Sequence, residues 1–179
     1  MTFDLPKSVE VGENTYQIRT DFRVILESFV MLDDQDLTDA DKTEALLRMF
    51  YAERPSEPEA ALQAFTDFVD PRHGSQGKKS SGRLIDWQQD FDLMVAPINH
   101  ILGFECRAVD YLHWRTFLSA YLEIPPDSVF ARVLRIREKL RTGKKLEKNE
   151  RSWYNKNRDL VHLKPKFSRA EEEIINGWT

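Results

Sequence analysis

The spacing of apolar residues changes from alternating to helical about twenty residues into the chain. In SVEVGENTYQIRT, Val9 and Val11, then Tyr16 and Ile18, alternate with polar residues on either side of a Gly-Glu-Asn turn. This alternation is typical of a short β-hairpin. In the segments that follow, apolar residues recur three and four positions apart, which is the spacing of amphipathic helices. The pattern therefore predicts a mainly α fold preceded by a short N-terminal β-hairpin.

Start and stop signals divide the rest of the sequence into about seven helices. Thr38 with Asp41, and Ser56 with Glu59, have the residue types and the spacing of a capping box. Polar segments, often with proline or glycine, follow the apolar stripes and end them. The predicted helices lie at about residues 20–32, 38–54, 56–69, 86–103, 108–123, 127–143 and 146–160.

Single residues set several of these boundaries. Asp86 and Asp127 are expected N-caps, because a carboxylate can accept a hydrogen bond from the first free backbone amides of a helix. Gly103 and Gly143 are expected to end their helices, since glycine readily adopts a left-handed conformation. Pro97 lies inside a predicted helix and is expected to bend it.

The polar stretch at residues 70–83, DPRHGSQGKKSSGR, has no large apolar residue and is rich in glycine and serine. This composition predicts a mobile surface loop. The chain has 179 residues, which is enough for one full domain. We therefore expect a single compact helical domain over residues 1–165 that contains this loop. A C-terminal tail follows at 166–179, in which SRAEEEIINGWT indicates a short helix.

Charge is distributed unevenly along the chain. The net charge is −4, yet residues 1–130 hold 12 basic and 23 acidic side chains, a net charge of −11. Residues 131–179 hold 14 basic and 7 acidic side chains, a net charge of +7. This asymmetry indicates that the basic part meets an acidic surface, which can be nucleic acid, an acidic protein or the acidic part of this chain.

The basic residues of the last third are the candidate partner-binding side chains. They are Arg132, Arg135, Lys139, Lys144, Lys145, Lys148 and Arg151. Trp153 and Tyr154 lie beside them in the sequence and can stack on bases, so a nucleic-acid-binding surface is one interpretation. Glu138, Glu147 and Glu150 interrupt the positive run, and the sequence pI of about 5.6 is far below the value above ~9 expected of a nucleic-acid-binding domain. A protein partner fits at least as well.

The residue types that carry out catalysis do not form a recognisable motif. The four histidines never occur at the spacing of a metal-binding pair, and the single cysteine, Cys106, has no neighbouring base. Asp86 and Asp90 lie one helical turn apart, but capping and the helix dipole explain them better than a nuclease site. His113 is interpreted as a packing or hydrogen-bonding residue. The sequence therefore predicts a non-enzymatic protein without a metal or cofactor.

Four segments together carry a resemblance to a known family. They are TDFRVILESFVMLDDQDLTDADKTEALLRMF, then LIDWQQDFDLMVAPINHILGF with an Asp-aromatic-x-Gln-Asp helix, LHWRTFLSAYL with a Leu-His-Trp-x-x-Phe helix, and ERSWYNKNRDL. In this order and spacing they resemble the bacteriophage family named for gene product fifteen. The resemblance covers roughly residues 5–165.

The resemblance implies a role in phage tail morphogenesis as a tail-assembly chaperone. Such a protein would hold the long tape-measure protein soluble while tail-tube subunits polymerise around it. The implied partners are therefore the tape-measure protein, the tail-tube protein and a companion tail-assembly chaperone. The alternative is a nucleic-acid-binding morphogenesis or regulatory protein that uses the basic C-terminal helices.

The expected location is the cytoplasm of the bacterial host. No apolar run approaches the ~20 residues that a membrane span needs, and the acidic start MTFDLPKSVE lacks the features of a signal peptide. A chaperone that leaves its client as the tube polymerises would also be absent from the finished virion.

Overall fold

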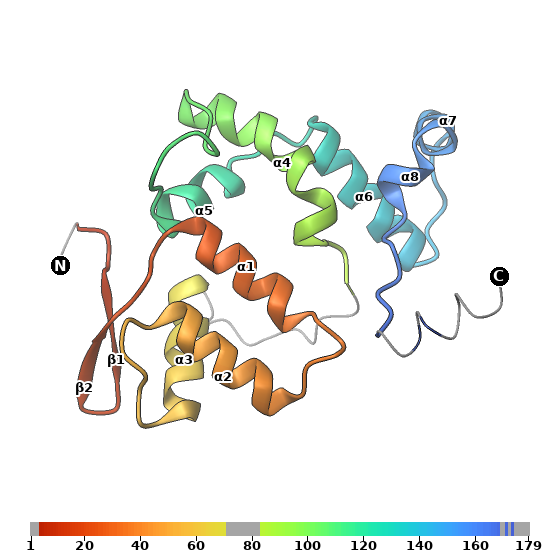
Figure 1. Ribbon diagram of the computed structural model, residues 1–179. Coiled ribbons are helices and arrows are strands. Elements are labelled where there is room, and N and C mark those ends of the chain that lie inside the picture. Colours follow the sequence, from red (N-terminus) through yellow and green to blue (C-terminus); the bar gives the residue numbers. More distant parts are fainter. Residues whose placement is uncertain (1–3, 71–82, 169–170, 172, 174–179) are drawn as a thin grey trace. The chain divides into compact units, whose positions relative to one another are not determined.

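The computed structural model describes residues 4–70, 83–168, 171 and 173, and these form a mainly helical fold with an N-terminal hairpin (Figure 1). The elements are β1 (Ser8–Val11), β2 (Asn14–Gln17), α1 (Phe22–Leu32), α2 (Asp39–Phe50), α3 (Pro58–Val69), α4 (Trp87–Leu102), α5 (Trp114–Leu122), α6 (Val129–Arg141), α7 (Lys148–Lys156) and α8 (Arg158–Val161). The predicted fold class is confirmed. The predicted loop at 70–83, apart from its two end residues, and most of the predicted tail at 166–179 lie outside the described residues.

The chain divides into two compact units. Among the described residues, unit 1 comprises residues 4–70 with Tyr111–Phe117 and the residues from Lys166 onward. Unit 2 comprises residues 83–110 with Leu118–Pro165, so α5 contributes its first turn to unit 1 and its remainder to unit 2. The expectation of one domain over residues 1–165 stays a prediction.

The hairpin forms as its sequence predicts. Val11 pairs with Asn14 across a two-residue turn, and Gly12 takes the left-handed φ of 59° at the first turn position. That position favours glycine because a side chain would strain the left-handed backbone. Two-residue turns of this kind match the right-handed twist of the strands they join, so the turn determines the register of the hairpin.

Side-chain caps start the first two helices of unit 1. Asp21 accepts a hydrogen bond from the backbone N–H of Arg23 at the start of α1. Thr38 and Asp41 form the predicted reciprocal capping box at the start of α2. The capping box predicted for Ser56 with Glu59 is wrong, because α3 begins one residue later than that box requires. Pro58 takes the first helical position, where its missing N–H costs nothing.

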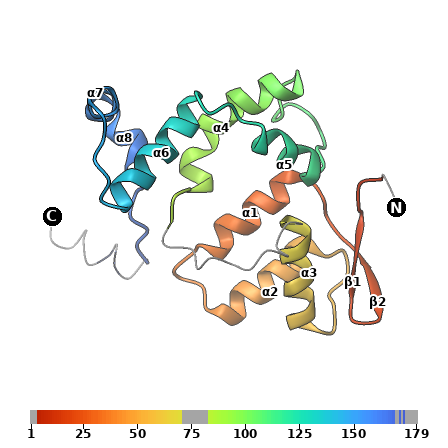
Figure 2. The ribbon, with the colours of Figure 1, turned by 180° about the vertical axis from the view of Figure 1, so that it is seen from behind.

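Apolar helix faces build the core of unit 1. α1 packs on α2, α2 on α3, and α3 on β1, as the view from behind also shows (Figure 2). Phe50 contacts the rings of Phe65 and Phe68 with centroids 5.0 and 5.3 Å apart. Tyr51 is buried beside them and its hydroxyl donates to the carbonyl of Ala61 at 2.8 Å. Burial without a charge partner raises the pKa of Tyr51 to about 12.

The predicted helix at 108–123 begins later than expected, at Trp114. Leu112 is held extended, because its N–H donates to the Asp21 carboxylate and its carbonyl accepts from the N–H of Phe22. These tertiary bonds override the local helical pattern. Tyr111, three positions before Trp114, and Leu122, at the end of α5, are 54% and 47% exposed. The buried residues of α5 are Trp114, Phe117 and Ala120.

Unit 2 agrees with some of the predicted helix features and departs from others. α4 bends in its middle, where Pro97 interrupts the backbone ladder (Figure 1), and it ends at the left-handed Gly103 as expected. Ser128 caps α6 in place of Asp127 by accepting from the N–H of Ala131. The predicted helix at 146–160 is divided into α7 and α8 at Asn157, whose side chain donates to the carbonyl of Trp153.

No helix in the described part of the chain is long and apolar enough to cross a membrane.

Candidate functional site

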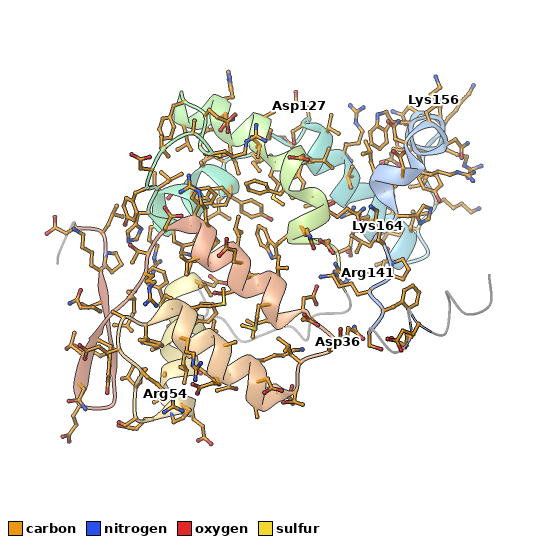
Figure 3. The ribbon with its side chains drawn as sticks, in the orientation of Figure 1. Asp36, Arg54, Asp127, Arg141, Lys156 and Lys164 are labelled. Carbon is orange, nitrogen blue, oxygen red and sulfur yellow. The ribbon has the colours of Figure 1, made fainter. Side chains whose placement is uncertain are left out.

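A groove between α6 and α7, in unit 2, is lined mainly by charged and polar side chains. It has a volume of about 470 Å³ and is called the α6/α7 groove below. The residues that line it are Arg132, Arg135, Lys139, Glu147, Asn149, Glu150 and Trp153. Figure 3 labels Arg141 and Lys156, which mark the C-terminal ends of α6 and α7. All of these residues belong to unit 2.

Local sequence patterns position the two walls of the groove. Arg132, Arg135 and Lys139 recur at three and four positions along α6, so they share one face of that helix. Val133 and Ile136 lie on another face and are fully buried in unit 2. Because its apolar face is buried in unit 2, α6 is fixed in place, and its basic face is fixed with it.

The wall formed by α7 begins with a capping box of two glutamates. The backbone N–H of Glu147 donates to the Glu150 carboxylate at 2.9 Å, and the backbone N–H of Glu150 donates to the side-chain oxygen of Asn149 at 2.8 Å. This start fixes Glu150 on the first turn of α7. The turn before α7 is also fixed, because α6 ends at Gly143 with a left-handed φ of 67° as predicted, and the N–H of Lys144 bonds back to the carbonyl of Lys139.

Opposite charges meet across the groove. Lys139 Nζ lies 2.7 Å from both carboxylate oxygens of Glu150, and Arg135 Nε lies 3.8 Å from the same carboxylate. The hydrogen bond from Lys139, followed by the backbone N–H of Glu147, lowers the pKa of Glu150 below its ordinary value. Glu150 is therefore a structural partner of α6. Arg135 makes only a longer contact with Glu150, which a ligand can replace.

An arginine and a tryptophan complete the groove. The guanidinium of Arg132 lies over the Trp153 ring, 5.4 Å from its centroid. Stacking of this kind holds the charge beside an aromatic surface and leaves the guanidinium N–H groups available to acceptors. The groove thus offers a cation and an apolar ring face side by side.

The structure brings together some of the sequence-predicted binding residues and separates others. Arg132, Arg135 and Lys139 line the groove. Four more are exposed and lie outside its lining: Lys144, Lys145, Lys148 and Arg151. None of these four makes an ion pair among the described residues. Their role in binding stays a prediction.

Sequence reasoning treated the glutamates beside the basic run only as interruptions. In the structure Glu147 and Glu150 are lining residues, together with Asn149 and Trp153. The three-residue spacing of the two glutamates is the capping-box signal that could have placed them at a helix start. Their approach to α6 depends on tertiary packing, for which the sequence has no comparable signal.

A buried ion pair anchors α6 to the start of α4. The Arg137 guanidinium donates to both carboxylate oxygens of Asp90 at 2.6 and 2.8 Å, and the two side chains are 5% and 0% exposed. Arg137 also donates to three backbone carbonyls, those of Leu84, Leu160 and Val161. Asp90 is therefore the partner of a buried cation, a role the sequence interpretation based on the helix dipole missed.

The other polar residues of DWQQD explain the rest of that segment. Asp86 accepts from the backbone N–H groups of Gln88 and Gln89, which confirms the predicted cap of α4. The Gln89 side chain donates to the carbonyl of His162 and accepts from the N–H of Lys164. The segment thus caps its own helix and ties the chain after α8 to α4.

The hydrogen-bonding role predicted for His113 is confirmed in unit 1. Its Nδ1 accepts from the backbone N–H of Arg115, and its Nε2 lies 2.8 Å from the carbonyl of Pro6. Since Nδ1 is an acceptor, the proton of the neutral ring lies on Nε2 and is donated to Pro6. His113 therefore caps α5 and ties it to the segment before β1.

The residues that the structure describes contain no group of three or more histidine, cysteine, aspartate or glutamate side chains that could hold a metal ion.

A first prediction concerns the protonation of Glu150. Because its folded pKa is lowered, the Lys139 pair contributes stability above the unfolded pKa of a glutamate and loses it as pH falls through the lower folded value. A carboxyl carbon-13 titration by NMR should therefore show Glu150 ionising at lower pH than an unpaired glutamate. In Lys139→Met the pKa should rise toward the ordinary value. Equal titration of Glu150 in both proteins would contradict the pairing.

Comparison with known proteins identifies a family for this chain. A family model described as bacteriophage Gp15 protein matches residues 1–163, a range that includes every residue lining the α6/α7 groove. No curated protein and no solved structure matches the chain.

Proposed function

The chain belongs to the bacteriophage Gp15 protein family and is thus a phage protein, and from this premise we propose that it is a non-enzymatic assembly chaperone of phage tail morphogenesis. In this proposal its clients are the tape-measure protein and the tail-tube subunits, and a companion chaperone assists it. It works in the cytoplasm of the bacterial host and leaves before the virion is finished.

The observation that carries the proposal is the combination of charge and ring surface in the α6/α7 groove. Arg132 and Arg135 supply cations, and Trp153 supplies an apolar face next to them. A client helix with an acidic residue and an apolar residue one turn apart presents both complements on one face. Partly exposed charge pairs contribute little free energy each. Binding of this kind is therefore readily reversed, as a chaperone displaced by polymerising tube subunits requires.

The test of the proposed function is co-expression with the neighbouring tail proteins of the same phage. The tape-measure protein should be recovered in the soluble fraction, and in complex with this chain, only when the two are produced together. A tape-measure protein that is equally soluble alone, with no complex on co-purification, would overturn the proposal. The same measurement with the tail-tube protein decides which client the chain prefers.

A second prediction separates contact in the groove from overall charge. Arg132→Glu with Arg135→Glu should slow client association at low salt by roughly tenfold, because it reverses two charges at the contact. The matched control is Lys144→Glu with Lys145→Glu, which makes the same change in net charge at exposed positions outside the groove. Association rates from stopped-flow fluorescence provide the comparison. Equal slowing by both pairs would mean that the groove makes no specific contact.

One observation favours the alternative of a nucleic-acid-binding protein. Residues 131–165 hold 12 basic and 4 acidic side chains, a net charge of +8, and Trp153 stands among them. The geometry of the groove weighs against it, because a phosphate there would meet Glu147 and Glu150, and Lys139 is already bonded to Glu150. Titration with duplex and single-stranded DNA at two salt concentrations tests this alternative. Salt-sensitive micromolar binding, without binding to tail proteins, would reverse the ranking.

A further inference from the structure

A second groove, in unit 1, follows the edge of the hairpin. It has a volume of about 570 Å³ and runs between β1 and α3, so it is called the β1/α3 groove. Five consecutive residues from Ser8 to Gly12 line one side. Consecutive strand residues point to opposite faces of a sheet, so a groove that they all line must run along the edge of the strand.

The backbone of β1 presents unused hydrogen-bonding groups to this groove. The bond from Ile18 N–H to the Lys7 carbonyl, at 3.0 Å, fixes the alternation of the antiparallel ladder. In this alternation the N–H and C=O groups of Val9 point toward β2, and those of Ser8 and Glu10 point away from β2. Within the described part of the chain, the outward groups of Ser8 and Glu10 make no hydrogen bond. An edge in this state is a template for another strand.

The opposite wall leaves room for a main chain. Ala60, Gln63, Ala64 and Asp67 lie at three and four spacing on one face of α3 and line the groove. The two alanines have the smallest side chains that a helix favours, so α3 does not fill the space beside the strand edge. Phe68 and Arg115 complete the lining, with the Arg115 guanidinium 5.3 Å from the centroid of the Phe68 ring. An extended segment that pairs with the outer edge of β1 therefore lies beside the alanines of α3.

The charge around the groove selects the chemistry of its occupant. Residues 4–70 hold 16 acidic and 6 basic side chains, a net charge of −10. Glu10 and Asp67 are exposed in the groove lining, and a Cβ atom added at Gly12 would meet the carboxylate of Glu57 at 2.5 Å. Acidic groups are thus present on the strand side, on the helix side and at the turn, and they outnumber the one basic residue of the lining, Arg115. A basic segment is the complementary partner.

We propose that the β1/α3 groove binds an extended lysine- or arginine-rich segment of a partner protein, which adds to β1 as a third strand. Main-chain hydrogen bonds to Ser8 and Glu10 provide the affinity of such a contact, and the acidic rim provides its preference for basic residues. The site lies in unit 1 and is independent of the helical client assigned to the α6/α7 groove.

The test uses the full chain and two synthetic probes. The first is an acetylated seven-residue peptide that alternates lysine with threonine and valine, and the second is the same peptide N-methylated at every internal amide. N-methylation leaves the charges and side chains in place but removes the donors that strand addition requires. At low salt the first peptide should slow hydrogen exchange at the Ser8 and Glu10 amides by about tenfold or more, and the second should leave it unchanged. Equal effects of the two peptides, or no protection at these amides, would overturn the proposal.

Proline substitutions in the hairpin provide a matched pair of variants. Glu10 and Thr15 face each other in the same non-bonded pair of the ladder, so both N–H groups point outward and neither bonds across the hairpin. Glu10→Pro removes a donor from the groove, whereas Thr15→Pro removes one from the far edge of β2. The peptide should lose at least about tenfold in affinity for Glu10→Pro and keep its affinity for Thr15→Pro. Glu10→Gln, which loses only the charge, should fall between them, and equal affinity for all three variants would contradict strand addition.

Discussion

Replacement of Arg137 with methionine is expected to lower the free energy of unfolding by about 3–5 kcal/mol, the usual cost of removing one partner from a buried ion pair. Asp90 is 0% exposed and would keep a carboxylate with no cation beside it. Chemical denaturation followed by circular dichroism and by tryptophan fluorescence measures the loss, because Trp87 and Trp153 both belong to unit 2. A loss below about 1 kcal/mol would show that water or a rearranged side chain replaces the guanidinium.

The size of this expected loss in the free energy of unfolding follows from the Arg137 guanidinium, all of whose N–H groups donate hydrogen bonds. Its five N–H donors match five acceptor contacts, two to the Asp90 carboxylate and three to backbone carbonyls. Lysine has only three donors on a single nitrogen and cannot reproduce this geometry. Arg137→Lys should therefore remain well below the wild type in stability although it keeps the charge.

Two further variants separate the ion pair from the carbonyl bonds. Asp90→Leu combined with Arg137→Met removes both charges, so the double variant should recover part of the stability that the single change loses. Recovery should be incomplete, because the carbonyls of Leu84, Leu160 and Val161 lose their donor. Lys139→Met is the surface control, since the Lys139–Glu150 pair is partly exposed and should contribute at most about 1 kcal/mol.

Features encoded by a few neighbouring residues could be predicted from the sequence. The Thr38–Asp41 capping box, the Asp86 cap and the stops at Gly103 and Gly143 each depend on residues within a turn of one another. The hairpin depends on its two-residue turn in the same way. Local chemistry decides these features before any tertiary contact forms, so sequence patterns are sufficient to find them.

Features that join distant residues could not be predicted. Asp90 and Arg137 are 47 positions apart, and nothing in either local segment shows that they meet. The start of α5 differs from the prediction for the same reason, because Leu112 donates to the Asp21 carboxylate and accepts from the N–H of Phe22, which holds that segment extended. In the candidate site the sequence predicted the basic residues of α6. It did not predict that the Glu150 carboxylate of α7 approaches Lys139 and neutralises part of their charge.

Replacement of Phe117 with alanine is expected to cost about 3–5 kcal/mol in the free energy of unfolding. Phe117 is 0% exposed, and its ring stacks on Phe22 with centroids 4.6 Å apart and on Trp114 with centroids 5.8 Å apart. The change removes the middle ring of this stack and leaves a cavity between two rings that backbone and side-chain bonds hold in place.

The surroundings of Phe117 limit how far that cavity can collapse. Trp114 is tied by its indole N–H to the carbonyl of Val69, and the backbone of Phe22 is tied by its N–H to the carbonyl of Leu112. The Trp114 ring cannot move into the space without breaking its hydrogen bond, so the loss should lie toward the upper end of the range. The Leu-His-Trp-x-x-Phe segment therefore acts through stability: its residues hold the start of α5 in the core of unit 1.

Comparison with an exposed phenylalanine tests whether burial is the cause. Phe104 is 42% exposed, and Phe104→Ala should change the free energy of unfolding by no more than about 0.5 kcal/mol. Phe117→Leu keeps most of the apolar volume and should lose less than Phe117→Ala. Urea denaturation of the three variants under one condition gives the ranking. A loss for Phe117→Ala as small as that for Phe104→Ala would mean that the stack does not stabilise unit 1 and that this segment has another role.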